Sequence, residues 1–134
     1  NSYSARRAGT VSTGNATRGG FSGTPGVGAL ALSLVPGERG QDALIADLDE
    51  GLLVQSVSGI HSGVNPISGD FSTGAAGLLI SDGAVGAPVR EITIAATLQT
   101  MLLDSVEFGG DLEWLPVRSA GLSLVIRDVT MSGS

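Results

Sequence analysis

The chain has 134 residues, 21 of them Gly and none Cys, and carries 13 acidic against 7 basic residues, a net charge of −6. This length fits a single domain, 1–134, and the lack of Cys excludes disulfides, thiolate metal sites and a Cys nucleophile. The acidic balance and the scattered arginines argue against nucleic acid or a membrane surface as partner. We expect a cytoplasmic protein, because the uncharged stretches are too polar for hydrocarbon and no export signal is visible.

The first quarter of the chain predicts little regular structure. Residues 1–26 are polar and Gly-rich, which is typical of an extended arm or loop, and the β-rich core is expected to begin at residue 27. Leu30, Leu32 and Leu34 alternate with small residues and predict a strand that ends at Pro36-Gly37. The start without Met and a charged fraction of only 15% lead us to expect a fragment of a longer protein, part of whose surface is covered by another domain or chain.

The remaining chain alternates between strand and helix patterns. Ser81-Asp82-Gly83 is a tight-turn signature between two strands, and Pro88 places the return strand at an edge or breaks it. Helices are predicted over 41–48 and 95–105, and strands over 52–58, 71–80, from 84, 106–108, 112–115 and 122–129. The fold class expected is mainly β (α+β): an antiparallel, strongly curved or barrel-like sheet with one or two short helices.

Few residues are suited to catalysis. A zinc site needs three or four converging N, S or O ligands, and the chain has one His and no Cys. His61 lies between Ser58 and Ser62, but this spacing does not form a nucleophile elbow. Three interpretations of His61 remain. It is a loop histidine without a catalytic role, a histidine that contacts substrate or partner, or the base of a hydrolase. The first is favoured. This domain alone is therefore not expected to catalyse a reaction.

The most informative stretch is 63–77. Asn65-Pro66 and Ser68-Gly69-Asp70 are turn formers between two strands, and the small residues around them permit close approach of a backbone. That backbone is either a second strand of the same fold or an extended peptide. From the residues alone, a pair of tight turns is the favoured interpretation.

Four segments of the chain resemble the TldD/PmbA family, long described as modulators of DNA gyrase. Residues 64–72 (VNPISGDFS) followed by 74–77 (GAAG) are similar to the signature of that family's C-terminal domain. Tyr3-Ser4-Ala5-Arg6 with Gly9 and Thr13-Gly14-Asn15 resembles the motif with which that domain begins. Residues 88–95 and 126–133 resemble the segment before its helix and its closing strand.

The resemblance implies a C-terminal domain of a cytoplasmic metallopeptidase that works as a heterodimer on unfolded or flexible peptides. In the family, one subunit holds zinc through a His-Glu-x-x-x-His helix and a Cys of its C-terminal domain, while the PmbA (TldE) type lacks these ligands. The ligand Cys would follow Gly110-Asp111-Leu112, yet here only Glu113-Trp114 separates this motif from residues 115–117. The resemblance therefore implies the subunit without catalytic residues, no cofactor in this domain, and zinc in a TldD-type partner.

Three functional hypotheses follow. The first is a subunit that completes the peptide cleft and the partner interface. Its candidate lining residues are His61, Asn65, Ser68, Asp70, Phe71 and Ser72. The second is a regulatory protein-binding module, for example one linked to gyrase, and the third is the hydrolase that uses His61. The isolated chain is a candidate for self-association through the surface meant for its partner.

Overall fold

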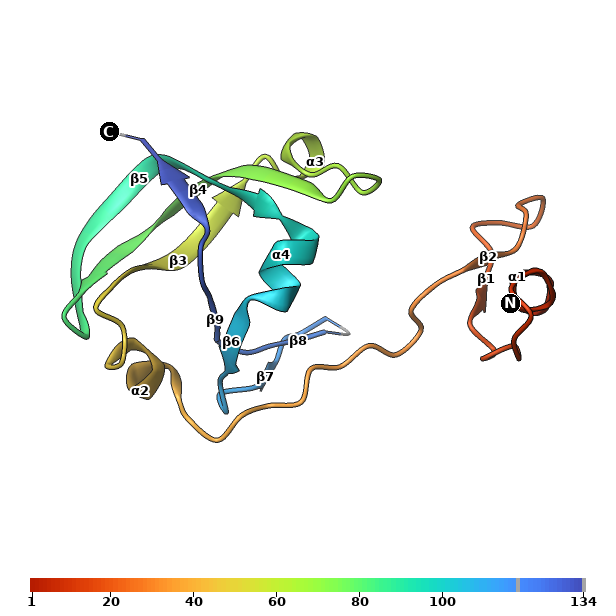
Figure 1. The fold of residues 1–134 in the computed structure, drawn as a ribbon, viewed down its shortest axis with the longest axis horizontal. Helices are drawn as coiled ribbons and strands as arrows, with labels where there is room; N and C mark the ends of the chain where they lie inside the picture. The colour runs from red at the N-terminus through yellow and green to blue at the C-terminus, as the bar shows by residue number, and fades with distance from the viewer. Residues whose placement is uncertain (118, 134) are drawn as a thin grey trace. The chain divides into compact units, whose positions relative to one another are not determined.

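The computed structural model describes residues 1–117 and 119–133, without the side chains of residues 105 and 106. It divides into two compact units, 1–34 and 35–134, which are drawn in one colour gradient in Figure 1. Antiparallel strand pairs and short helices make up both units, so the predicted mainly β class is confirmed. No strand pairing among the described residues closes into a barrel, and the strongly curved sheet is not confirmed.

The first unit contains a helix that the sequence analysis missed. Residues 1–26 were expected to be an extended arm, but α1 spans Ser2–Arg7, and β1 (Ala16–Thr17) pairs with β2 (Gly26–Val27). The helix begins at Asn1, whose side chain accepts a hydrogen bond from the Ser4 backbone N–H at 2.9 Å. Asn is one of the preferred residues at this position because its carbonyl oxygen satisfies an otherwise free N–H group.

The strand predicted over Leu30, Leu32 and Leu34 is wrong. Only Gly26–Val27 is a strand in this region, and all three leucines are exposed. An alternating pattern yields a strand only when a neighbouring strand supplies backbone partners, and the pairing of β2 with β1 stops at Val27. The alternation therefore carried no structural information here.

The second unit is built around a four-stranded antiparallel sheet in the order β10-β5-β4-β3. Its strands are β3 (Glu50–Ser58), β4 (Asp70–Ser81), β5 (Ala84–Thr97) and β10 (Thr130–Ser132). The predicted strands over 52–58 and 71–80 are thereby confirmed. The predicted turn joins β4 to β5, and Asp82 (φ 49°) and Gly83 (φ 74°) adopt the left-handed conformation that a tight hairpin requires.

β5 is long but irregular. Its pairing with β4 shifts register between Leu78 and Ile80, next to Pro88, and again between Ala75 and Gly77. Beside the second shift, Glu91 has a φ of 59°, an uncommon backbone conformation for a residue other than glycine and typical of a bulge. β10 pairs with β5 only over Thr93–Ala95. Pro88 therefore lies where β5 has a neighbour on one side, which is where a strand tolerates a residue without an N–H group.

The hydrophobic core lies on one face of this sheet. Its buried centre is Ala75 of β4 with Ile92 and Ile94 of β5. The partly buried side chains packed against this centre are Leu52, Phe71, Val89 and Val129. Thr73 of β4 lies two residues from Ala75 and therefore on the same face of the strand. Its side chain is buried, with 2% exposed.

Among the described residues of the second unit, three helices accompany the sheet. α2 (Gln41–Ile45) confirms the predicted first helix in shortened form and buries Leu44 and Ile45. α3 (Ile60–Gly63) contains His61, which was expected to lie in a loop. The helix predicted over 95–105 is α4, Leu98–Leu103, because its first predicted residues continue β5 and pair with β4. None of the helices in the part of the chain that the structure describes is long and apolar enough to cross a membrane.

The last part of the chain forms two small antiparallel pairs. β6 (Ser105–Phe108) pairs with β9 (Leu124–Ile126), and β7 (Glu113–Trp114) pairs with β8 (Ala120–Gly121). β6, β7 and β9 lie within or overlap the strands predicted over 106–108, 112–115 and 122–129, although each is short, whereas β8 was not predicted. In Figure 1 they lie below α4, at the blue end of the gradient.

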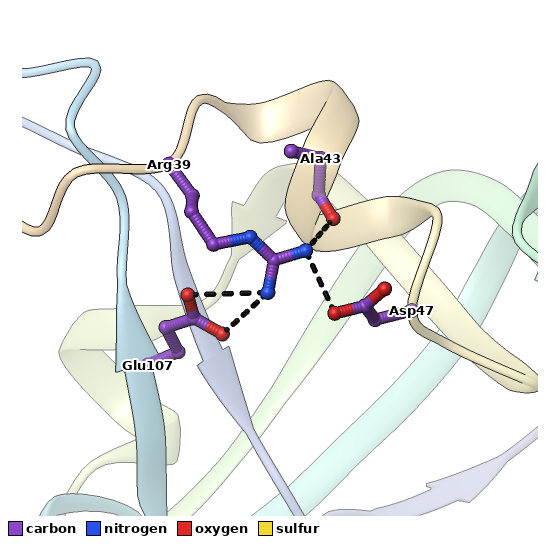
Figure 2. A network of polar contacts seen from close by, with 4 residues as sticks. All are labelled: Arg39, Ala43, Asp47 and Glu107. Atoms are coloured by element: carbon purple, nitrogen blue, oxygen red, sulfur yellow. Dashed lines mark hydrogen bonds and ion pairs between the residues drawn. The ribbon is translucent and has the colours of Figure 1, made fainter.

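An arginine fastens α2 to β6 (Figure 2). The Arg39 guanidinium contacts Asp47 at 2.7 Å and donates to both carboxylate oxygens of Glu107 at 3.2 and 3.4 Å. It also donates to the backbone carbonyl of Ala43. The hydrogen bond to Asp47, followed by the charges of both carboxylates, raises the pKa of Arg39. This network joins the segment before α2 to the β6–β9 pair.

Candidate functional site

The turn between α3 and β4 is closed by its own polar side chains. The Asn65 side-chain oxygen accepts hydrogen bonds from the backbone N–H groups of Ile67 (2.9 Å) and Ser68 (3.3 Å). The backbone N–H of Asn65 donates to the Asp70 carbonyl at 2.9 Å. Gly69 has a φ of 84°, and its N–H donates to the Asn65 carbonyl at 2.8 Å. The turn is therefore a fixed element rather than an open loop.

Two further side chains of the predicted set stiffen the same turn. The Ser68 hydroxyl donates to the Asp70 carboxylate, Oγ to Oδ2, at 2.6 Å. The Asp70 backbone N–H in turn lies 3.4 Å from the Ser68 hydroxyl oxygen, which accepts its hydrogen bond. Both residues remain exposed, so the carboxylate of Asp70 contributes a negative charge to the surface of the turn.

The remaining three predicted residues lie in different surroundings. Phe71 pairs across a bridge with Val64 and packs against the hydrophobic core. Ser72 is exposed on β4, and its backbone carbonyl approaches Gly63 so closely that a side chain at residue 63 would clash with it. His61 is exposed on α3. The structure thus brings the six candidates into one region, where Asn65, Ser68 and Asp70 form the turn and Phe71 anchors it.

Gln99 is a residue of this region that the sequence analysis did not find. Its side-chain amide donates to the Ser68 carbonyl at 3.1 Å. The Gln99 side chain also fills the space that a Cβ atom on residue 69 would occupy. The backbone N–H of Leu98 donates to the Gly69 carbonyl at 2.8 Å. These contacts fasten the start of α4 to the turn, across 31 residues of sequence, and no local pattern predicts such a contact.

The donors in this region do not fit a zinc site. His61 is the only histidine of the chain, which has no cysteine. Across the described ranges 1–117 and 119–133, no group of three or more His, Cys, Asp or Glu residues is arranged to hold a metal ion. A zinc centre needs three or four such ligands.

The motif Gly110-Asp111-Leu112 has a structural role. The Asp111 carboxylate accepts hydrogen bonds from the Ser123 hydroxyl at 2.6 Å and from the Ser123 backbone N–H at 3.0 Å. Both hydrogen bonds lower the pKa of Asp111, and the bond from the Ser123 hydroxyl has the larger effect. Gln41 at the start of α2 donates to the same hydroxyl at 2.8 Å. Asp111 therefore fixes the segment after β6 to the start of β9.

A shallow pocket of about 370 Å³ lies elsewhere, over β4, β5 and β10. Leu79, Pro88, Ile92 and Met131 give it an apolar lining, with Arg90 as its charged member. None of the six candidate residues lines this pocket, so it is separate from the turn region.

Comparison with known proteins identifies the relatives of this fold. Residues 1–133 match the family model described as the PmbA/TldA metallopeptidase C-terminal domain. The chain belongs to the PmbA/TldD family. It is 36% identical to the metalloprotease PmbA homolog of Haemophilus influenzae over 135 residues, which is 99% of this chain and 27% of that protein. It is 38% identical to metalloprotease PmbA of Escherichia coli O157:H7 over 112 residues, 84% of this chain and 22% of that protein.

Solved structures of the PmbA/TldD family agree with this fold. TldE from Thermococcus kodakarensis matches 98% of this chain with a TM-score of 0.77 at 29% identity, over 30% of its own length. A Thermotoga maritima protein described as a candidate modulator of a DNA gyrase matches 98% with a TM-score of 0.82 at 31% identity, over 29% of its length. The chain thus spans less than a third of these relatives. The family resemblance predicted from the motifs is confirmed.

Proposed function

We propose that this chain is the C-terminal domain of a PmbA/TldE-type subunit that contains no catalytic residues and works with a zinc-bearing TldD-type partner on unfolded or flexible peptides. The observation that carries the proposal is the similarity of residues 1–133 to the family's C-terminal domain combined with a donor set of one His and no Cys in this chain. The similarity to PmbA proteins and to TldE supports the same assignment. The zinc ion belongs to the partner in this proposal.

The chain's own contribution is the shape of the substrate cleft and of the subunit interface. The turn Asn65–Asp70 is fixed by internal hydrogen bonds, so it presents its surface without a large ordering cost on binding. β3 is the last strand of the sheet order β10-β5-β4-β3, and an extended peptide pairs readily with such an edge. His61, Asn65, Ser68, Asp70, Phe71 and Ser72 remain the proposed lining.

Co-expression of the full-length protein with its zinc-bearing relative tests the proposal. Three samples are compared for cleavage of an unstructured peptide: this protein alone, the relative alone, and the co-purified complex. We expect activity from the complex only, with zinc in the complex and none in this protein alone. Full activity from the relative alone, or stoichiometric zinc in this protein alone, would contradict the proposal.

A regulatory module linked to gyrase is the second candidate. It is favoured by solved relatives from Thermotoga maritima and Bacteroides thetaiotaomicron that are described as candidate modulators of DNA gyrase. The net charge of −6 makes direct DNA contact unfavourable, so this function would act through protein contacts. Recovery of gyrase without a zinc-bearing relative in an affinity purification would favour it over the first candidate.

A further inference from the structure

The segment 29–35, between β2 and α2, is apolar and exposed. Six of its seven residues are Ala, Leu or Val, and it carries no charge. All seven residues are exposed, Leu32 by 87% and Val35 by 83%. In Figure 1 the chain passes from β2 to α2 without a helix or strand. Folded proteins seldom leave a continuous apolar run of this kind in water unless another surface covers it.

The backbone of this segment is also without partners. Across the described ranges 1–117 and 119–133, no N–H or C=O group of residues 29–35 is hydrogen-bonded. In an extended chain, Leu30, Leu32 and Leu34 lie on one side, and the small residues between them lie on the other. The segment therefore has the free hydrogen-bonding groups and the single apolar face of a strand that lacks a neighbour.

Among the described strands of the central sheet, β3 has the open edge that suits this segment best. β10, at the other end of the sheet, is only three residues long. The part of β5 that β10 leaves unpaired contains Pro88, whose nitrogen donates no hydrogen bond, and its pairing with β4 is irregular. β3 has nine residues and pairs with β4 alone. Its length therefore matches a partner of seven residues.

The open edge of β3 is uncharged and partly apolar. Leu52 packs against the core, and Val54, two residues further on, lies on the same face and is 42% exposed. The last five residues of β3 are all exposed. Neither 29–35 nor 51–58 contains a charged residue, so the net charge of the chain does not oppose a contact between them. Three leucines placed beside β3 extend the apolar face of the sheet.

We propose that residues 29–35 of one copy add as a strand to the β3 edge of a second copy. Both halves of the contact belong to one chain, so two copies each donate the segment to the other and the contact closes as a symmetric dimer. Each copy gains backbone hydrogen bonds along an edge that is otherwise open. The dimer also excludes an extended peptide from β3, a consequence that rests on the function proposed above.

Sedimentation of the full-length protein over a dilution series tests this inference. We expect a dimer that dissociates on dilution. Leu32→Lys places a charge in the apolar contact and should weaken the dimer by about tenfold or more. Leu103→Lys is the control, because Leu103 of α4 is 84% exposed and lies outside the proposed contact. A wild type that is monomeric at all concentrations, or equal dimerisation of the two variants, overturns the inference.

Engineered cysteines test the choice of β3. This chain has no Cys, so Ser33→Cys and Ser56→Cys are made in separate full-length proteins, one with a size tag, and mixed under mild oxidation. We expect a disulfide-linked pair from this mixture. Ser33→Cys mixed with Ser132→Cys, on β10 at the other end of the sheet, should give no more than a mixture without Ser33→Cys. Equal linkage to Ser56→Cys and Ser132→Cys, or linkage only to the latter, overturns the inference.

Two other results would assign the segment to a different surface. If Leu32→Lys dimerises normally but no longer co-purifies with the zinc-bearing relative, the segment belongs to that interface, and the inference is overturned with the proposed function intact. Protection of the amides of 29–35 from hydrogen exchange in a monomeric sample also overturns it, because the segment is then covered within its own chain. The proposed function is judged by peptide cleavage alone, so its failure is distinct from the failure of this inference.

Discussion

Thr73 offers a direct test of how the sheet face is packed. Its side chain is 2% exposed, and its hydroxyl oxygen has no hydrogen-bond partner among the described residues. A buried hydroxyl without a partner costs about 1–3 kcal/mol in proteins. Thr73→Val keeps the shape and removes this cost. We therefore expect the free energy of unfolding to rise by about 1 kcal/mol, and Tm by about 4 °C.

Two companion variants separate the hydroxyl from the methyl group. Thr73→Ser keeps the hydroxyl and loses a buried methyl, so it should be about 1 kcal/mol less stable than the wild type. Thr73→Ala loses both and leaves a small cavity, and it should also fall below Thr73→Val. Urea unfolding gives the order, provided that the m-values agree. A Thr73→Val protein that is clearly less stable than the wild type would refute the reasoning, because the hydroxyl would then have a stabilising partner.

Three other substitutions test the site and its supports. Gly63→Ala should destabilise the protein by about 2 kcal/mol in urea unfolding, because the new Cβ would clash with the Ser72 backbone carbonyl. Gly121→Ala is the control. It should be close to neutral in the same assay, since no atom lies within 4 Å of its new Cβ. Asn65→Ala should lower stability by about 1 kcal/mol and Asn65→Asp by less, since the carboxylate still accepts the two turn hydrogen bonds; equal unfolding curves for both would contradict the role of this side chain. Asp111 has a lowered pKa in the folded state, so its stabilisation is present above the unfolded value near 3.9 and is lost as pH falls through the folded value. In Asp111→Asn, the free energy of unfolding should therefore fall less steeply than in the wild type as the pH is lowered below about 4. If unfolding measured against pH shows the same decrease in both proteins, this role of Asp111 is refuted.

Local signals predicted the central sheet well. The turn Ser81-Asp82-Gly83 was visible in the sequence because Asp and Gly tolerate the positive φ angles that the structure shows there. β3 and β4 also followed from their apolar pattern, since Ala75 of β4 is buried in the core and Leu52 of β3 packs against it. These predictions succeeded where the signal depends on nearby residues.

Predictions failed where distant residues decide the structure. The alternation of Leu30, Leu32 and Leu34 lacked a pairing strand, which the sequence does not reveal. The helix predicted from residue 95 begins at Leu98, because pairing with β4 extends β5 over residues with a helical pattern. α1 was missed although Asn1 was a visible capping signal, since the Gly-rich surroundings outweighed it.

The turn within the candidate region was predictable in position, but its contacts were not. The turn formers between Asn65 and Asp70 were recognised, and the structure shows that their side chains bond within the turn. Their contact with substrate remains a prediction. Gln99 gave no sequence signal, because its partner Ser68 lies 31 residues away.

A titration tests the central claim most directly. A fixed amount of the zinc-bearing relative is mixed with increasing amounts of this full-length protein, and cleavage of an unstructured peptide is followed. The account predicts that the rate rises from near zero and reaches a plateau at equal amounts of the two subunits. A rate that is already maximal without this protein, or that does not respond to it, would contradict the account.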